Sequence, residues 1–186
     1  MSTYDRLLEL AGTLIEKNGF EGFSYSDLAK ALDIRKASIH YHFPTKIDLG
    51  IAYCETKIAS FSALETHILT LAPGVDQLNA YIEAFANCAY ERRMCGIYAM
   101  LSDSNLFPLE LQNVVSQLAS HELRILSEIL QRGRDADKLI FVSTAADMAI
   151  IVCNALKGAL LLNRTSPYDA YTRTAIALVL MLQNQQ

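Results

Sequence analysis

Apolar residues recur at helical spacing along most of this 186-residue chain, and few glycines or prolines interrupt them. The first predicted helix covers about residues 3–17, where Leu7, Ala11 and Ile15 share one face and Asn18-Gly19 provides a stop. Further helices are predicted at about 25–32, 36–43, 45–71, 75–93, 108–132, 144–164 and 167–183. These eight segments are the clearest helices of a predicted all-α fold of about nine helices.

Residues 24–43 are the most informative segment of the chain. Ser24 is a good N-cap, and Asp27 three residues later completes a capping box. Asp33 follows this first short helix and suits a turn, because Asp tolerates left-handed backbone. The next short helix turns Ile39 and Phe43 inward at i, i+4 spacing. The segment therefore predicts a helix-turn-helix.

The outward faces of the second short helix carry a cation, hydroxyls and rings, at Lys36, Ser38, His40, Tyr41 and His42. Such groups are typical of a helix that reads DNA. The net charge is −4, but the segment from Lys30 to Lys46 contains four basic residues and only one aspartate. The distribution of charge matters more than its total for DNA binding. Lys46 lies within a second capping pair, Thr45 and Asp48, at a helix N-terminus, which favours phosphate.

In these residues the chain resembles the tetracycline-repressor (TetR) family of bacterial regulators. The similarity covers about residues 4–50, through Asn18-Gly19-Phe20, Leu28–Ala31, Ser38–Phe43 and Lys46–Leu49. Three positions depart from the family pattern: Asp33 replaces a usual Gly, Arg35 a usual Ser and His40 a usual Tyr.

The resemblance implies a DNA-binding domain at residues 1–46 and a helical domain for effector binding and dimerisation at residues 47–186. It also implies a homodimer on a palindromic double-stranded operator, with a small-molecule effector that changes the spacing of the recognition helices. We expect a repressor rather than an enzyme. The matching positions expected to line the DNA are Ser26, Lys36, Ala37, Ser38, His40, Tyr41, His42 and Lys46, with Tyr25 a weaker candidate.

The two last predicted helices are apolar on nearly every side, and such helices must be covered on every side. Either they are central to a monomeric core, or they build a homodimer interface, as the resemblance also implies. The second reading is favoured, because the chain has little other material to cover them. The expected interface residues are Ile151, Asn154, Ala155, Gly158, Leu161, Ala175, Leu178 and Leu182.

The middle of the chain is rich in aromatic and soft side chains, which form core in most proteins but also line apolar ligand pockets. The residues expected to bind the effector are Phe61, Tyr81, Phe85, Cys88, Tyr98, Met100 and Phe107.

Four cysteines lie in apolar, helix-like sequence without the spacing of a disulfide scaffold or zinc site, which fits a reducing cytoplasm. His40 and His42, two residues apart, point to nearly opposite sides of a helix and cannot chelate one ion. We therefore expect no metal and no cofactor. A redox-responsive regulator that uses Cys88 and Cys95 remains an alternative. The stretch 145–162 is apolar, but Asp147, Asn154 and Lys157 argue against a membrane span.

Two other functions are compatible with an all-helical chain. One is a small-molecule-binding protein or enzyme with a structural helix-turn-helix, although no Gly-rich phosphate loop or metal-spaced ligand set supports it. The other is an interaction module whose C-terminal helices bind a different partner.

Overall fold

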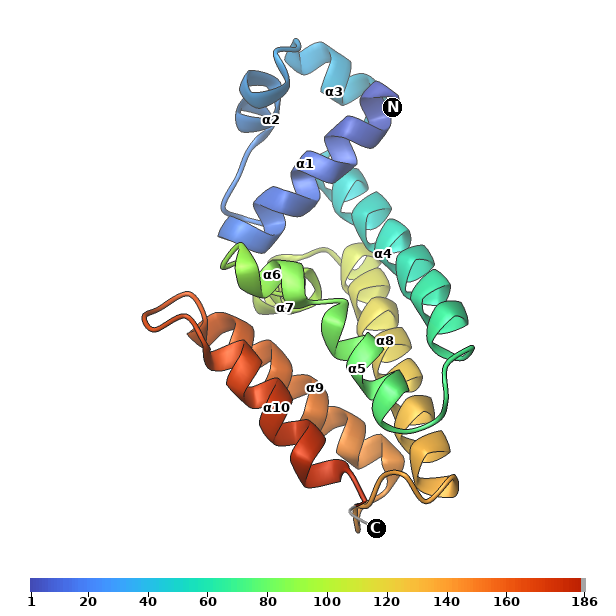
Figure 1. Ribbon diagram of the computed structural model, residues 1–186. Helices are drawn as coiled ribbons and strands as arrows, with labels where there is room; N and C mark the ends of the chain where they lie inside the picture. Colours follow the sequence, from blue (N-terminus) through green and yellow to red (C-terminus); the bar gives the residue numbers. More distant parts are fainter. Residues whose placement is uncertain (185–186) are drawn as a thin grey trace. The chain divides into compact units, whose positions relative to one another are not determined.

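The computed structural model describes residues 1–184, which form ten α-helices and one short 3-10 helix (Figure 1). The helices are α1 (Thr3–Asn18), α2 (Tyr25–Leu32), α3 (Lys36–His42), α4 (Lys46–Ile68), α5 (Val75–Glu83), α6 (Ala86–Tyr90), α7 (Gly96–Asp103), α8 (Leu109–Asp135), α9 (Ala145–Leu162) and α10 (Ala170–Leu182), with the 3-10 helix η1 (Ser104–Leu106) before α8. The all-α prediction is confirmed.

The chain folds into two compact units. Unit 1 comprises Met1–Ala59 and Gly96–Ala119, and unit 2 comprises Ser60–Cys95 with the described chain from Ser120 onward. Helices α4 and α8 each contribute residues to both units. This grouping differs from a division at residue 46, because α7 and η1 pack with the amino-terminal helices.

Unit 1 is built on aromatic rings that join its amino-terminal helices to η1 and the start of α8. The Phe20 ring meets the Phe107 ring edge-on, with 5.1 Å between centroids. Gly50 of α4 lies against Phe20 so closely that an added Cβ would stand 3.0 Å from its ring. Asp103 at the end of α7 accepts a hydrogen bond from the Glu21 amide. These contacts fix the helix-turn-helix to the rest of its unit.

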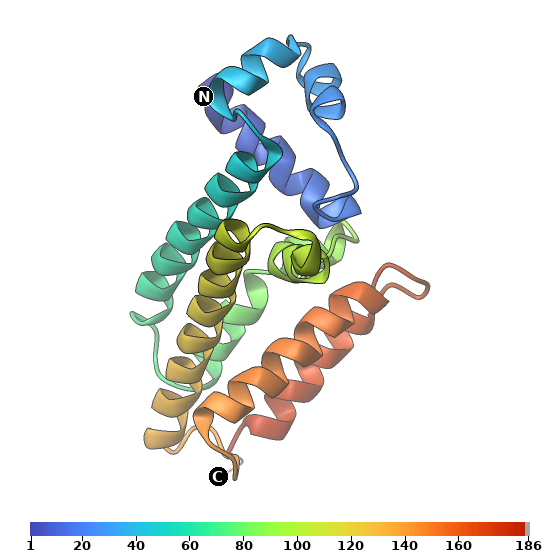
Figure 2. The ribbon, with the colours of Figure 1, turned by 180° about the vertical axis from the view of Figure 1, so that it is seen from behind.

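Unit 2 contains α9 and α10, which run side by side and antiparallel (Figures 1 and 2). Their common end is closed by an isolated antiparallel bridge between Leu139 and Gln183. At the other end, Asn163 accepts a hydrogen bond from the Tyr171 amide and donates one to the Ala89 carbonyl of α6. Polar contacts therefore join segments of unit 2 that lie far apart in the sequence.

The single helix predicted at residues 75–93 is wrong, because the structure divides it into α5 and α6. The Tyr171 hydroxyl donates to the Ile82 carbonyl, the group that would accept from the Ala86 amide in an uninterrupted helix. Phe85 lies at the break and points into the core. The interruption thus depends on a residue of α10.

Candidate nucleic-acid interface

The first helix of the helix-turn-helix, α2, begins and ends where its polar residues predict. The Asp27 carboxylate accepts hydrogen bonds from the Ser24 amide and hydroxyl, both at 2.8 Å. These bonds hold the pKa of Asp27 below its usual value. Asp33 ends α2 in the left-handed conformation, at φ 53° and ψ 48°. The turn prediction for Asp33 is confirmed.

Helix α3 has one buried side and one broad exposed side. Ile39 and Phe43 are buried and anchor it to unit 1. The Tyr41 side chain is 84% exposed, the highest value among the described tyrosines except Tyr90. The other exposed residues of the expected DNA-contacting set are Ser26, Lys36, Ala37, Ser38 and His40. An anchored helix with an open polar face has the form that enters a major groove.

The chain between α3 and α4 is bound through three consecutive carbonyl groups. The Tyr25 hydroxyl lies 2.9 Å from the Phe43 oxygen and 2.5 Å from the Thr45 oxygen. The oxygen between them, that of Pro44, lies 3.0 Å from His40 Nδ1. Burial, with a smaller contribution from the Asp48 charge, raises the pKa of Tyr25 to about 12. Tyr25 therefore acts as a neutral donor that fixes the end of α3.

Lys46, at the start of α4, lies between two aromatic rings. Its Nζ is 4.7 Å from the Phe20 centroid and 4.6 Å from the Phe23 centroid, and Glu21 Oε2 is 3.9 Å away. Burial lowers the pKa of Lys46, although the Glu21 and Asp103 charges oppose this. A quarter of the side chain stays exposed. Lys46 thus packs against two rings, while part of its side chain remains accessible from outside the protein.

His42 is only partly exposed, because an α1 residue covers it. The Tyr4 ring meets the His42 ring at 6.0 Å and the Phe43 ring at 4.9 Å. Tyr41 lies on the other side of His42, with 5.1 Å between their centroids. The amino-terminal helix therefore borders the exposed face of α3.

Unit 2 buries an ion pair that the sequence pattern did not predict. Lys157 Nζ lies 2.8 Å from Glu122 Oε1, which also accepts a 2.7 Å hydrogen bond from the Tyr81 hydroxyl. The Lys157–Glu122 contact is not aligned as a hydrogen bond, and Nζ instead faces the Phe85 ring. Burial opposes the charge on Lys157, but the neighbouring Cys95, Glu122 and Cys153 outweigh it, so its pKa is raised. One signal was present: Glu122 falls on the apolar stripe of α8.

The expected effector residues divide between the two units. In unit 2, Phe85 lies 6.1 Å from Phe61 and 5.4 Å from Tyr81 between ring centroids. Cys88 is in α6 of the same unit and is partly exposed. The other three, Tyr98, Met100 and Phe107, belong to unit 1, where Met100 and Phe107 are buried. Unit 2 alone therefore combines these rings with a buried ion pair.

An exposed apolar surface covers α9 and α10. Ile151 and Leu161 of the predicted interface are about half exposed, and Asn154 is exposed beside them. An added Cβ on Gly158 would meet no atom within 4 Å. By contrast, Leu178 and Leu182 are buried in their own chain. On α10 the exposed apolar residues are Ile176, Leu180 and Met181.

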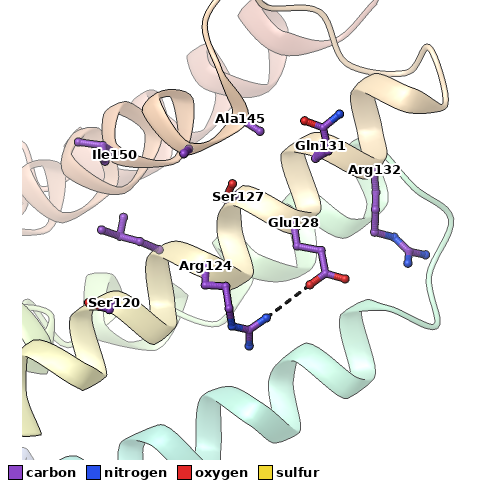
Figure 3. A pocket seen from close by; sticks show the side chains of 10 residues that line it. Ser120, Arg124, Ser127, Glu128, Gln131, Arg132, Ala145 and Ile150 are labelled. Atoms are coloured by element: carbon purple, nitrogen blue, oxygen red, sulfur yellow. Dashed lines mark hydrogen bonds and ion pairs between the residues drawn. The ribbon is translucent and has the colours of Figure 1, made fainter.

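A surface groove of about 640 Å³ runs between α8 and α9 (Figure 3). Its lining is apolar at Leu123, Ala145 and Ile150, and charged where Arg124 pairs with Glu128 at 3.4 Å. Arg124 also forms a two-pronged ion pair with Glu65 at 2.7 Å. Arg124, one of the two arginines that line the groove, is thus already neutralised.

The described residues contain no group of three or more His, Cys, Asp or Glu side chains placed to hold a metal ion. The four cysteines are free thiols, and burial raises the pKa of Cys54 to about 12. Helix α9 is long and apolar enough to cross a membrane, but 44% of it is buried inside the protein. Its buried Lys157 is paired with Glu122, as expected for a core helix.

Comparison with known proteins places the amino-terminal helices in a family. Residues 7–53 match the profile described as "Bacterial regulatory proteins, tetR family". A 42-residue segment is 40% identical to the biofilm operon negative transcriptional regulator IcaR of Staphylococcus aureus, covering 23% of each chain. The transcriptional repressor NemR of Escherichia coli is 24% identical over 156 residues, 81% of this chain and 78% of NemR.

Solved structures extend the similarity to the whole fold. A TetR-family regulator from Agrobacterium tumefaciens superposes with a TM-score of 0.89 at 26% identity, over 97% of both chains. The reduced form of Escherichia coli NemR gives a TM-score of 0.81 at 21% identity over 98% of both chains, which shows the shared fold. The matched profile, the helix-turn-helix geometry and these neighbours agree: the chain belongs to the TetR family of DNA-binding transcriptional regulators.

Proposed function

We propose that this chain is a homodimeric, effector-responsive repressor that binds a near-palindromic DNA operator. The observation that carries the proposal is the two-sided α3, with Ile39 buried and Lys36 and Tyr41 exposed. The second helix of such a motif enters the major groove, and two copies must stand about 34 Å apart. The similarity to repressors such as IcaR and NemR supports repression rather than activation of transcription.

The exposed face of α9 and α10 supports the homodimer. Ile151, Leu161 and Leu180 are large apolar side chains that are each about half exposed, and exposed apolar surface of this kind is typical of a protein–protein interface. Gly158 leaves open space in the middle of this face, where the helix of a second copy can approach closely. Ala155 and Asn154 flank that space and complete the proposed contact.

The effector is proposed to act on the interior of unit 2. Its aromatic cluster of Phe61, Tyr81 and Phe85 provides an apolar wall, and the Glu122–Lys157 pair provides polar groups. Such a combination is typical of small-ligand sites. A bound effector need favour the non-binding spacing of the two recognition helices by only about 1–3 kcal/mol.

The test is selection of duplexes from a random-sequence library, followed by affinity measurement on the selected duplex. We expect Tyr41→Ala to weaken binding at least tenfold while the protein remains a dimer by size-exclusion chromatography. Tyr90→Ala is the matched control, because Tyr90 is equally exposed at 86% but lies on α6. Equal losses for both variants, or no preference over random duplex, would contradict the proposal.

A redox-responsive regulator is the second candidate. Cys95 is buried near Lys157, and the two groups interact electrostatically. The related NemR structure is described as a reduced form. Peroxide would convert the thiol to a sulfenic acid and release water. We expect peroxide to lower DNA affinity in wild type but not in Cys95→Ser; equal sensitivity of the two would remove this candidate.

A further inference from the structure

His40 is held on α3 by two contacts that fix its ring. Its Nδ1 lies 3.0 Å from the Pro44 carbonyl oxygen, and its ring meets the Tyr25 ring edge-on at 5.0 Å. Tyr25 is itself fixed by the Phe43 and Thr45 carbonyls. A flip of the imidazole would therefore break its hydrogen bond to the Pro44 carbonyl.

The Pro44 contact determines which nitrogen of His40 carries a proton. A carbonyl oxygen only accepts hydrogen bonds, so Nδ1 must donate. In a neutral imidazole the other nitrogen, Nε2, is then a bare acceptor. Nε2 becomes a donor only when the ring takes up a second proton. Nε2 of His40 thus changes from a hydrogen-bond acceptor to a donor when the ring is protonated at lower pH.

The position of His40 on α3 indicates which part of DNA it meets. The first residues of a recognition helix contact base edges, whereas His40 lies in the second turn, beside the α3–α4 junction. At least half of protein–DNA hydrogen bonds go to the phosphate and sugar backbone. A phosphate oxygen is an acceptor and repels the lone pair of a neutral Nε2. Only the protonated ring can bind it.

We propose that His40 donates a hydrogen bond from Nε2 to a DNA phosphate, so that operator binding takes up one proton at each recognition helix. This inference rests on the proposed function. It assigns to His40 a contact whose strength is set by pH, unlike that of a phenol, which is a donor at every pH up to its own ionisation.

The charged and titratable groups around His40 determine how readily its ring takes up the second proton. On α3, the Lys36 ammonium one turn earlier opposes a second positive charge, and His42 follows two residues later. Tyr25 of α2 stays neutral, and the charge of Asp48 in the first turn of α4 acts on Tyr25. The phosphate is present only in the complex, so binding itself supplies the added attraction for the proton.

The consequence is a steep pH dependence within the range where imidazoles titrate, between about pH 5 and 8. One proton taken up per subunit corresponds to at most about a tenfold change in affinity per pH unit, and two per dimer to about a hundredfold. Affinity should fall as pH rises.

The experiment measures fluorescence anisotropy of a labelled duplex, selected from a random-sequence library, at pH 6, 7 and 8 and constant ionic strength. We compare wild type with His40→Gln, His40→Tyr and the control His67→Gln, because His67 is an exposed histidine near the end of α4 in unit 2. The DNA affinity of wild type and of His67→Gln should weaken at least tenfold from pH 6 to 8. His40→Tyr should bind with little pH dependence, because the phenol restores a permanent donor, and His40→Gln should also lose the pH dependence. Thermal unfolding monitored by circular dichroism checks that each variant is folded.

Three results would overturn the assignment: a pH dependence that survives in His40→Gln, a flat wild-type profile, or wild-type binding that weakens on acidification. The last would mean that Nε2 accepts from the amino group of a base. If wild type shows no preference for any duplex at any pH, the proposed function fails as well. Selective binding with a flat profile removes only the His40 inference.

Discussion

Lys157 Nζ lies 2.8 Å from Glu122 Oε1, and the two side chains are 0% and 1% exposed. Two charges withdrawn from water in this way are tolerated only together. Tyr81 adds a hydrogen bond to Glu122, and the Phe85 ring covers the ammonium. The pair therefore specifies how α8 and α9 pack in unit 2.

Removing one partner of the Glu122–Lys157 pair should lower the free energy of unfolding far more than removing both. We expect Glu122→Gln to lower the free energy of unfolding by about 3–5 kcal/mol, because Lys157 is left as an uncompensated buried charge. The double variant with Lys157→Met should recover most of the loss. Asp169→Asn, which breaks an exposed pair with Arg173 at 3.8 Å, serves as the control and should change stability by less than about 0.5 kcal/mol. Equal losses in single and double variants, by urea unfolding, would contradict the pairing.

Tyr25→Phe should destabilise unit 1 by about 1 kcal/mol, the usual net value of one hydrogen bond. The native pKa of Tyr25, about 12, lies above the unfolded value of about 10. Its contribution is therefore fully present below pH 10 and is lost as pH rises toward 12. The stability difference between wild type and Tyr25→Phe should shrink over this range in denaturant titrations. A difference that stays constant from pH 9 to pH 11.5 would disagree with the hydroxyl contact.

Lys46→Met tests the proposed contact of Lys46 with a DNA phosphate. It keeps the packing between Phe20 and Phe23, because methionine retains a flexible apolar stem. We expect thermal unfolding to change little. The slope of log affinity against log salt should become less steep by about 0.9 for each phosphate that the protein no longer neutralises. Titrations at several salt concentrations measure this, and an unchanged slope would restrict Lys46 to its packing role.

Gly158→Ala should separate the folding of one chain from the association of two. Alanine favours a helix interior by about 1 kcal/mol over glycine, and its methyl group meets no atom of its own chain. We therefore expect the helix to remain intact while the dimer dissociates more readily, by sedimentation velocity. Gly96→Ala provides a contrast, because its added methyl would collide with the buried Tyr53 hydroxyl and should destabilise the fold itself. A dimer unaffected by Gly158→Ala would contradict close approach at this position.

Local signals in the sequence predicted much of the amino-terminal region. The capping pairs at Ser24 and Thr45 and the turn at Asp33 depend on neighbours within three residues, and the structure places them accordingly. The break between α5 and α6 instead depends on Tyr171, 89 residues from Ile82. Periodicity along one helix contains no information about such a partner.

Some properties of the candidate site residues could also be predicted from the local sequence, whereas others depend on distant partners. Exposure of Lys36 and Tyr41 follows from the helical periodicity of α3, once Ile39 and Phe43 are assigned to the core. The fixed ring of His40 does not, because it depends on a carbonyl in the following turn and on Tyr25 of α2. The partner of Lys157 could likewise not be predicted from helical periodicity, since Glu122 lies on another helix 35 positions earlier.

The contacts of Phe20 with Phe107 and of Glu21 with Asp103 tie the amino-terminal helices to a segment that follows them by more than eighty positions. A chimera that transplants only residues 1–46 onto a foreign sensor would leave behind the surface on which those helices rest. A functional graft would have to carry residues 96–119 as well, or redesign the apolar surface around Phe20 that they cover.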